Sequence, residues 1–360
     1  MTIPTTMRAM VTMGHGGIDQ MVWHENWPTP EPMANEVLVK VKACGLNNTD
    51  VNTRSGWYSK AVSEATTGDA YETVSEDDPT WGAAPITFPR IQGADVCGEI
   101  VAVGDAVDSA RIGERIITDN WLRDPNDPTN INKTGYFGSE CDGGFAEYTT
   151  MPAVNAIPFH SHFTDAEMAT FSCSYSTAEG MLTRANVTDA DTVLVPGASG
   201  GVGGALVQLA KRRGARVIAL ASEAKHADVA ALGPDVILPR GPVDLRAALG
   251  DEKITVVADV VGGDYWPTLI DIIERGGRYT CSGAIAGPMV ELDLRTFYLR
   301  DLTFTGSTVI SPQVAKTLVK YIEANEVKPA LAATYPLSEL HAAQAAFIEK
   351  KHTGNIVVTP

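Results

Sequence analysis

A glycine-rich segment, residues 193–204, has the residue types that bind a dinucleotide. It reads Val-Leu-Val-Pro-Gly-Ala-Ser-Gly-Gly-Val-Gly-Gly and lies between a predicted strand and a predicted helix. In that context Gly200 permits a tight turn, Gly201 lets the backbone approach a pyrophosphate, and Gly203 lets the helix pack closely on the strand. The N-terminus of the helix would present N–H groups to the phosphates. A purely structural turn is the alternative. The cofactor-binding residues predicted here are Ser199, Gly200, Gly201, Val202 and Gly203.

The strand predicted next, residues 216–220, bears on the choice between NADH and NADPH. An NAD site usually has an acidic residue at the end of this strand, whereas this chain has Ser222 close to that position. Ser222 can donate a hydrogen bond to a 2′-phosphate, and Lys225 and Arg240 can supply positive charge. Glu223 argues the other way, because a carboxylate serves a ribose hydroxyl or repels a phosphate. Alternatively, Ser222 and Glu223 are the cap and first turn of a helix. The segment favours NADPH.

The elements around this segment alternate between strands and helices. Residues 192–195 form an apolar, β-branched run, and residues 204–213 have the spacing of an amphipathic helix. Such βαβ alternation implies parallel strands joined by right-handed crossovers. We therefore predict an α/β protein in which a doubly wound parallel sheet occupies residues 164–324.

The rest of the chain has a different texture. Residues 36–42 and 98–104 are β-type runs that alternate or nearly alternate, with turn residues at their ends. The tail returns to this pattern and ends in the strand-like residues 355–359. We expect the tail to pack on the N-terminal part, so that one β-rich domain comprises residues 1–163 and 325–360.

Composition narrows the possible partners. The chain has 360 residues, with 28 Lys and Arg against 44 Asp and Glu, for a formal net charge of −16. This charge argues against nucleic acid and against anionic membranes as partners, since both require basic surfaces. No apolar run reaches the roughly 18–20 residues that span a bilayer, and the N-terminus has no secretory-type apolar core. The five scattered cysteines do not form a disulfide pattern. We expect a cytoplasmic protein that acts on a small molecule.

Residues 59–92 are acidic and have no clear periodicity. Aromatic residues, including Trp57, Tyr58, Tyr71 and Trp81, are spread through and beside them. A solvated surface loop is the plain interpretation. The alternative is a lid or wall over a substrate cleft.

Several further motifs occur in a specific order along the whole chain. They are residues 43–50 (Ala-Cys-Gly-Leu-Asn-Asn-Thr-Asp), 53–58 (Thr-Arg-Ser-Gly-Trp-Tyr), 89–98 (Pro-Arg-Ile-Gln-Gly-Ala-Asp-Val-Cys-Gly), 103–104 (Val-Gly), 113–116 (Gly-Glu-Arg-Ile), 143–148 (Gly-Gly-Phe-Ala-Glu-Tyr), 259–263 (Asp-Val-Val-Gly-Gly) and 354–357 (Gly-Asn-Ile-Val). With the glycine-rich segment, they resemble the medium-chain dehydrogenase/reductase superfamily, especially its zinc-independent quinone oxidoreductase-like branch. The resemblance implies a GroES-like catalytic domain interrupted by a Rossmann domain, with the active site in the cleft between them. It also implies a homodimer, or a dimer of dimers, usually formed by joining Rossmann sheets edge to edge.

The resemblance also bears on metal binding. Zinc alcohol dehydrogenases of the superfamily hold catalytic zinc with Cys, His and Cys, and a Glu stands beside the His. At these positions this chain has Asn47, Ala94 and Cys173, with Asp95 in place of the Glu. Residues 121–140 also lack the cysteines of the family's structural zinc lobe. Because catalytic zinc needs about three protein ligands, we predict that the protein binds no zinc.

Without a metal, a conjugated acceptor is the easier substrate. When such an acceptor receives hydride, the negative charge spreads through an enolate, which hydrogen-bond donors can stabilise. We therefore expect hydride transfer from NADPH C4 to the β-carbon of an enone, enal or enoyl thioester, or to a quinone.

The resemblance assigns roles to residues on both parts of the chain. It places Asn47 near the nicotinamide ribose and the substrate, and it makes Tyr58 a donor to the substrate oxygen. Alternatively, Tyr58 is an ordinary amphipathic aromatic residue without a role in the reaction. Thr49 matches a proton-relay hydroxyl of the zinc enzymes, and Asp50 is expected to fix local backbone or pair with a base. The branch often has a second tyrosine where this chain has Val51, which leaves a more apolar pocket. The other residues expected at the cofactor are Thr177, Ser282, Gly283, Ala284 and Asn355.

Two other functions remain open from the sequence. One is a zinc alcohol dehydrogenase rebuilt around Cys173, Asp95 and a nearby cysteine. The other is a non-catalytic NADPH-binding protein, like the lens crystallins that share this fold.

Overall fold

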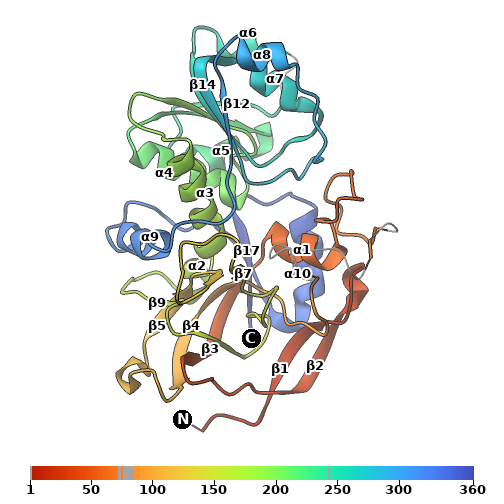
Figure 1. The fold of residues 1–360 in the computed structure, drawn as a ribbon, viewed down its shortest axis with the longest axis vertical. Helices are drawn as coiled ribbons and strands as arrows, with labels where there is room; N and C mark the ends of the chain where they lie inside the picture. Colours follow the sequence, from red (N-terminus) through yellow and green to blue (C-terminus); the bar gives the residue numbers. More distant parts are fainter. Residues whose placement is uncertain (1, 72–73, 76–84, 242–243) are drawn as a thin grey trace. The chain divides into compact units, whose positions relative to one another are not determined.

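The structure is a computed structural model that describes residues 2–71, 74–75, 85–241 and 244–360. The chain folds into two compact units (Figure 1). The first unit comprises residues 1–62, 67–173 and 311–360, and the second comprises residues 63–66 and 174–310. None of the helices in the described part of the chain is long and apolar enough to cross a membrane.

The second unit is shorter at both ends than the predicted range 164–324. Helix α9 (Val314–Glu323) belongs to the first unit. The Glu323 carboxylate accepts a hydrogen bond from the His160 backbone N–H at 2.7 Å, which ties α9 to that unit. At the other end, the boundary falls inside helix α3 (Ser172–Arg184).

The first unit is built on a mostly antiparallel sheet with the strand order β16-β17-β3-β4-β5-β9, and β8 also pairs with β3. The predicted strand at 36–42 lies within β3 (Glu36–Gly45), and the one at 98–104 overlaps β4 (Asp95–Val103) but extends one residue beyond its end. Strand β17 (Asn355–Thr359) pairs antiparallel with β3, so the tail joins the same sheet. The remaining strands are β1 (Thr6–Thr12), β2 (Met21–Pro28), β5 (Arg115–Thr118), β6 (Trp121–Arg123), β7 (Thr134–Tyr136), β8 (Tyr148–Pro152), β9 (Ala156–Pro158) and β16 (Leu331–Pro336).

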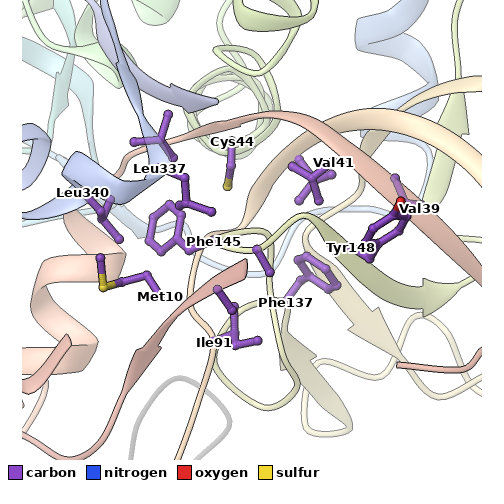
Figure 2. Packing of buried hydrophobic residues seen from close by; sticks show 14 of the residues in the cluster. Met10, Val39, Val41, Cys44, Ile91, Phe137, Phe145, Tyr148, Leu337 and Leu340 are labelled. Atoms are coloured by element: carbon purple, nitrogen blue, oxygen red, sulfur yellow. The ribbon is translucent and has the colours of Figure 1, made fainter. Parts of the chain in front are cut away.

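Apolar side chains from the sheet, from the antiparallel pair β1–β2 and from the C-terminal helix form the core of this unit. Figure 2 shows Met10 of β1, Val41 of β3, Phe145 and Leu340 among them. Cys44 is fully buried in this cluster, as expected for a small apolar-like residue. The helices of the unit, besides α9, are α1 (Asn48–Ser55), α2 (Asp165–Met168) and α10 (Leu340–Ile348), with 3-10 turns η1 (Ile18–Gln20), η2 (Ser109–Arg111) and η5 (Leu337–Glu339).

A fully buried arginine fixes helix α1. The Arg54 guanidinium donates to the Gly16 carbonyl at 2.6 Å, to the Gly68 carbonyl at 3.2 Å and to the Gln344 side chain at 3.2 Å. Because a buried guanidinium needs such acceptors, the helix cannot rotate without breaking these bonds. The residues at its start are thereby held in place.

The second unit is a parallel sheet with the order β12-β11-β10-β13-β14-β15. The chain builds one half outward from β10 and the other half outward from β13, which confirms the predicted doubly wound α/β fold. Its strands are β10 (Thr192–Val195), β11 (Arg216–Ala221), β12 (Val236–Pro239), β13 (Ile254–Asp259), β14 (Ile273–Cys281) and β15 (Thr303–Gly306). Its helices, besides most of α3, are α4 (Gly201–Arg212), α5 (His226–Ala230), α6 (Leu245–Leu249), α7 (Trp266–Asp271) and α8 (Leu294–Tyr298), with η3 (Glu223–Lys225) and η4 (Gly263–Tyr265).

Candidate functional site

The glycine-rich segment links β10 to α4 at the point where the strand order reverses. Helix α4 begins at Gly201, three residues before the predicted start at 204. A Cβ on Gly203 would lie 2.1 Å from the Gly197 carbonyl oxygen, so the helix packs closely on the turn that follows β10, whereas the prediction had it packed on the strand. Crevices beyond the carboxyl ends of strands at such a reversal are where dinucleotides bind in this kind of sheet. The segment therefore fits a nicotinamide dinucleotide.

The residue that forms the tight turn is Gly197, which the sequence analysis did not single out. Its φ is +66°, whereas Gly200 has φ −82° and ψ 171°, which any residue adopts. Gly200 closes this turn by donating its backbone N–H to the Gly197 carbonyl at 3.0 Å, while Gly197 supplies the left-handed backbone. Gly200 is exposed, and Ser199, Gly201 and Val202 are half-buried.

Two more loops leave the carboxyl ends of β13 and β14 beside each other. The Ser282 N–H donates to the Asp259 carbonyl at 3.3 Å, and the Ala286 N–H donates to the Val261 carbonyl at 2.8 Å. Ser282, Gly283 and Ala284 are all half-buried in this pair of loops. Because β13 is the parallel neighbour of β10, these residues follow strands that end at the same edge of the sheet as the glycine-rich segment.

A buried carboxylate that the sequence analysis did not assign orders these loops. Asp259 is fully buried, and its side chain accepts hydrogen bonds from the Val261 N–H at 2.7 Å and from the Tyr279 hydroxyl at 2.9 Å. Burial raises the pKa of Asp259, although these hydrogen bonds counteract part of that shift. The motif at 259–263 contained this residue, but its spacing gave no sign of the tyrosine on the next strand.

The residues predicted to select NADPH follow β11 and β12. Ser222 occupies the N-cap position of η3, but its side chain makes no capping hydrogen bond. Partial burial and the nearby Arg240 guanidinium both lower the pKa of Lys225. Two neighbouring cations whose charges repel each other favour a bound anion.

Thr177 and Asn355 lie in different units. Thr177 is half-buried on α3 in the second unit, whereas Asn355 starts β17 in the first unit. Asn355 is buried, and its amide donates to the Thr170 carbonyl at 3.4 Å. This contact gives Asn355 a structural role within its own unit.

The residues predicted for catalysis surround the start of α1. Asn47 precedes the helix, and its backbone N–H donates to the Asp50 carboxylate at 2.8 Å. The expectation that Asp50 fixes local backbone is thus confirmed. The Tyr58 hydroxyl hydrogen-bonds with the side chains of Thr49 and Asn52, while burial raises the pKa of Tyr58. Thr49 and Tyr58 are therefore brought together as one hydroxyl pair.

A second group of polar side chains gathers around Asp95, at the start of β4. Its Oδ1 atom accepts hydrogen bonds from the Asn120 amide at 2.8 Å and from the Cys173 backbone N–H at 2.9 Å. The Asn120 amide also donates to the Tyr136 hydroxyl at 3.1 Å. We call Asn47, Asp95, Asn120, Tyr136 and Cys173 the Asp95 cluster. Asn120 and Tyr136 were not predicted, because each comes from a segment distant in sequence.

Asn47 contributes a donor to this cluster. Its side chain is 7% exposed and lies close enough to Asp95 to lower the pKa of that carboxyl. Within the described residues, however, no hydrogen bond of normal geometry reaches the Asn47 Nδ2 atom. A buried amide N–H of this kind is suited to a ligand oxygen.

The two carboxyl groups near Asn47 titrate at unusually high pH. Desolvation is the main cause: it raises the pKa of Asp50 to about 7 and that of Asp95 to about 6. The Asp95 charge further raises the pKa of Asp50, whereas Arg54 lowers it. Both groups therefore change charge close to neutral pH.

The same positions fit zinc poorly. Ala94 has no ligand atom, and the Oδ1 atom of Asp95 already accepts two protein hydrogen bonds. Cys44 lies in the core, and the Cys97 thiol faces Asp165 at 3.6 Å. Over the part of the chain that the structure describes, no three His, Cys, Asp or Glu side chains are placed to hold a metal ion. We derive no chemistry through zinc.

The acidic residues 59–92 are described only in part. Trp81, with residues 72–73, 76–80 and 82–84, lies outside the described residues. Residues 63–66 belong to the second unit, where the Thr66 N–H donates to the Ile285 carbonyl at 3.0 Å. Ile285 directly follows the predicted cofactor residues 282–284.

Family models match both parts of the chain. The alcohol dehydrogenase GroES-like domain matches residues 33–161, and the zinc-binding dehydrogenase domain matches residues 201–324. A solved structure from Sinorhizobium meliloti 1021, with a provisional alcohol dehydrogenase name, is 45% identical to this chain. It covers 99% of this chain and 98% of its own, with a TM-score of 0.90.

Curated relatives are more distant but span almost the whole chain. The acryloyl-coenzyme A reductase of Metallosphaera sedula is 25% identical over 98% of this chain and all of its own. The NADPH-dependent alkenal/one oxidoreductase of Arabidopsis thaliana is 27% identical over all of this chain and 81% of its own. The quinone oxidoreductase of Rattus norvegicus is 25% identical over 94% of this chain and 92% of its own.

Fold, site and relatives together define an NAD(P)H-dependent oxidoreductase. The chain belongs to the medium-chain dehydrogenase/reductase superfamily, in its quinone oxidoreductase-like branch.

A methyl group at Gly203 should disrupt the dinucleotide-binding loop. In Gly203→Ala the new Cβ meets backbone that cannot move aside, so we expect the free energy of unfolding to fall by roughly 1–3 kcal/mol and dinucleotide binding to weaken. Gly204→Ala is the matched control, because its Cβ would meet the flexible end of Leu232 at 3.2 Å. Urea unfolding and fluorescence titration with NADPH measure both effects. Equal behaviour of the two variants would contradict the close-packing argument.

The raised pKa of Asp50 should make stability depend on pH. Its ordinary pKa is about 3.9, so between about pH 4 and pH 7 the folded state binds more protons than the unfolded state. Stability from this group therefore falls as pH rises through that window. Asp50→Asn keeps an acceptor oxygen but cannot ionise. Relative to the wild type, the free energy of unfolding of the variant, measured with urea, should be higher at pH 8 than at pH 5 by on the order of 1–3 kcal/mol. The same difference at both pH values would rule this out.

Proposed function

We propose that the protein is an NADPH-dependent reductase that transfers hydride to an activated C=C bond or a quinone without a metal. The observation that carries this proposal is the buried Asn47 Nδ2 atom, which has no normal hydrogen bond among the described residues. It stands where zinc enzymes of the superfamily have a metal ligand. A neutral N–H donor there serves a carbonyl oxygen, which gains negative charge as hydride arrives.

NADPH supplies the hydride, and the chain's own residues supply orientation and charge stabilisation. As the β-carbon receives the hydride, the electrons of the C=C bond move toward the carbonyl oxygen and form an enolate. Asn47 donates a hydrogen bond to that oxygen. A proton from water then completes the reduction at the α-carbon. For a quinone, the same electron pair yields the hydroquinone after protonation.

The relatives support this substrate class. The names of the Metallosphaera and Arabidopsis proteins both refer to an unsaturated carbonyl compound. It is a thioester in the first name and an alkenal or alkenone in the second. A quinone has the same conjugation between C=C and C=O. We therefore propose a conjugated carbonyl acceptor as the shared chemistry.

The choice of NADPH rests on the segment that follows β11. Ser222 is not used as a helix cap, and Lys225 lies near Arg240. These three side chains supply hydrogen bonding and positive charge suited to a 2′-phosphate. The name of the Arabidopsis relative points to the same cofactor.

Two alternatives are weaker. A zinc alcohol dehydrogenase agrees with the name of the Sinorhizobium structure, but Asn47 and Ala94 remove two ligands from the metal site. A non-catalytic NADPH-binding protein leaves the buried Asn47 donor without a use.

The proposed function predicts which substrates are turned over. NADPH oxidation, with NADH in parallel, should proceed with enones, enals, enoyl-CoA thioesters or quinones and not with simple ketones. A chelator should have no effect. Asn47→Ala should lower kcat by roughly 100-fold, whereas Asn48→Ala is the control, since the Asn48 side chain accepts a hydrogen bond from Lys350. Chelator-sensitive ketone turnover would support the zinc alternative. Cofactor binding without any turnover would support the non-catalytic one.

We also propose a homodimer joined through the parallel sheets. Strand β15 stands at the end of the sheet order, and exposed apolar residues precede it: Met289, Val290, Leu294, Tyr298 and Leu299. Exposed apolar residues beside a sheet edge are typical of an interface.

The five cysteines are free thiols, which supports the cytoplasmic location that we propose.

A charge in this apolar patch should separate the subunits. Leu294→Asp places a carboxylate where the dimer would bury an apolar side chain, so sedimentation should change from dimer to monomer. Val154→Asp is the control, because Val154 is similarly exposed but belongs to the first unit. A wild type that sediments as a monomer would overturn the proposed dimer.

A further inference from the structure

The carboxyl ends of β11 and β12 lie side by side, and a polar or charged residue follows each of them. The two strands are parallel, and Ala221, the last residue of β11, pairs with Pro239, the last residue of β12. Ser222 and Arg240 therefore leave neighbouring strands, which are about 4.8 Å apart in a sheet. In this kind of sheet, residues near this point meet the adenosine ribose, whose 2′-hydroxyl carries a phosphate in NADPH.

The end of β11 is also joined to the glycine-rich segment. The Ala198 N–H donates a hydrogen bond to the Leu220 carbonyl at 3.1 Å. Ala198 is fully buried and Leu220 is buried, so protein contacts alone set this bond. The predicted positions of the pyrophosphate and of the ribose are thus linked through adjacent peptide groups of the second unit.

A histidine side chain closes the loop that follows β11. The Nε2 atom of His226, the first residue of α5, lies 3.1 Å from the Ala221 carbonyl oxygen. Because a carbonyl oxygen can only accept, Nε2 carries the hydrogen and donates it. Inside the loop, the Lys225 N–H donates to the Ser222 carbonyl at 2.9 Å. The ring therefore ties a short turn, residues 222–225, back to the strand that precedes it.

We propose that His226 is a positioning residue for the choice of cofactor. Its ring holds residues 222–225 against the end of β11, so that the Ser222 hydroxyl and the Lys225 ammonium group are placed for the 2′-phosphate of NADPH. This inference rests on the proposed function, in which these two side chains and Arg240 select NADPH. His226 acts through the loop and not by contact with the phosphate.

Other roles for His226 predict different behaviour. If the ring only stabilised α5, its loss would weaken the binding of NADPH and NADH to the same degree. If the ring bound the phosphate directly, its loss and the loss of Lys225 would multiply, as expected for independent contacts. A positioning role instead predicts a loss for NADPH alone, and a smaller loss once Lys225 is already absent.

The experiment measures the Kd of NADPH, NADH and adenosine 2′-monophosphate by calorimetric titration. The proteins are the wild type, His226→Leu, His226→Gln, Lys225→Ala and the Lys225→Ala/His226→Leu double variant. We expect His226→Leu to raise the Kd of NADPH and of adenosine 2′-monophosphate roughly 10-fold, the effect of one hydrogen bond to a charged group. The Kd of NADH should stay unchanged, and the double variant should lose less than the product of the two single losses.

Two further variants serve as rescue and as matched control. His226→Gln keeps an N–H donor at a similar reach from the backbone and should recover most of the affinity for NADPH. His341→Leu is the control, because the His341 Nε2 atom likewise donates to a backbone carbonyl, that of Met21 at 2.8 Å, but in the first unit. It should leave all three Kd values unchanged. If His226→Leu does not fold by circular dichroism, His226→Asn replaces it, since its shorter amide does not reach the Ala221 carbonyl.

The outcomes separate this inference from the proposed function. Equal losses for NADPH and NADH, an unchanged Kd for NADPH, or multiplied losses in the double variant would overturn the positioning role while leaving the choice of NADPH intact. A wild type that binds NADH as tightly as NADPH would overturn that choice and this inference with it. Failure to reduce any conjugated acceptor would overturn the proposed reaction alone, because none of these measurements depends on turnover.

Discussion

A carboxyl group shut away from water must have hydrogen-bond donors, and Asp95 imposes this requirement on the whole first unit. Its donors come from the segment before β6 and from the first turn of α3, while Asn47 comes from the start of α1. These elements can satisfy Asp95 only if they converge on the start of β4. The buried Arg54 guanidinium adds the same kind of constraint to α1 from its other end. The hydrogen bonds of these buried polar groups can therefore form only when the elements of this unit are folded together.

The second unit depends on close approach of backbone rather than on buried charge. Helix α4 lies so near the preceding turn that Gly203 leaves no room for a side chain, and Gly197 turns the chain with a left-handed backbone. This approach brings the start of α4 to the end of β10, at the reversal of the sheet. The loops after β13 and β14 are kept at the same edge by Asp259, which joins them through Tyr279. The residues predicted to bind the nucleotide are thus the same few backbone positions that shape this edge of the sheet.

The sequence predicted features that depend on neighbours along the chain and missed those that depend on distant contacts. Residues 192–195 and 355–359 are strands with the predicted bounds, because apolar runs between turn residues are local signals. The parallel order of the sheet followed from the alternation of strands and helices. Asn120 and Tyr136 gave no such signal, since their importance comes from Asp95, 25 residues before Asn120 in the chain. Gly197 was overlooked because residues 193–204 contain five glycines, and the sequence alone does not say which of them carries the positive φ.

Replacing a metal ligand by an amide changes the electrostatics that a reductase must handle. A metal cation attracts an oxyanion, whereas Asp50 and Asp95 would repel one if both were ionised. Burial counters this repulsion, because it raises both pKa values toward neutrality and favours a state in which the pair carries less than two negative charges. A neutral donor next to partly protonated carboxyl groups can then stabilise an enolate, whose charge is already delocalised. A simple alkoxide carries a more concentrated charge and needs more stabilisation than one neutral donor supplies, which is the physical reason that we propose conjugated acceptors.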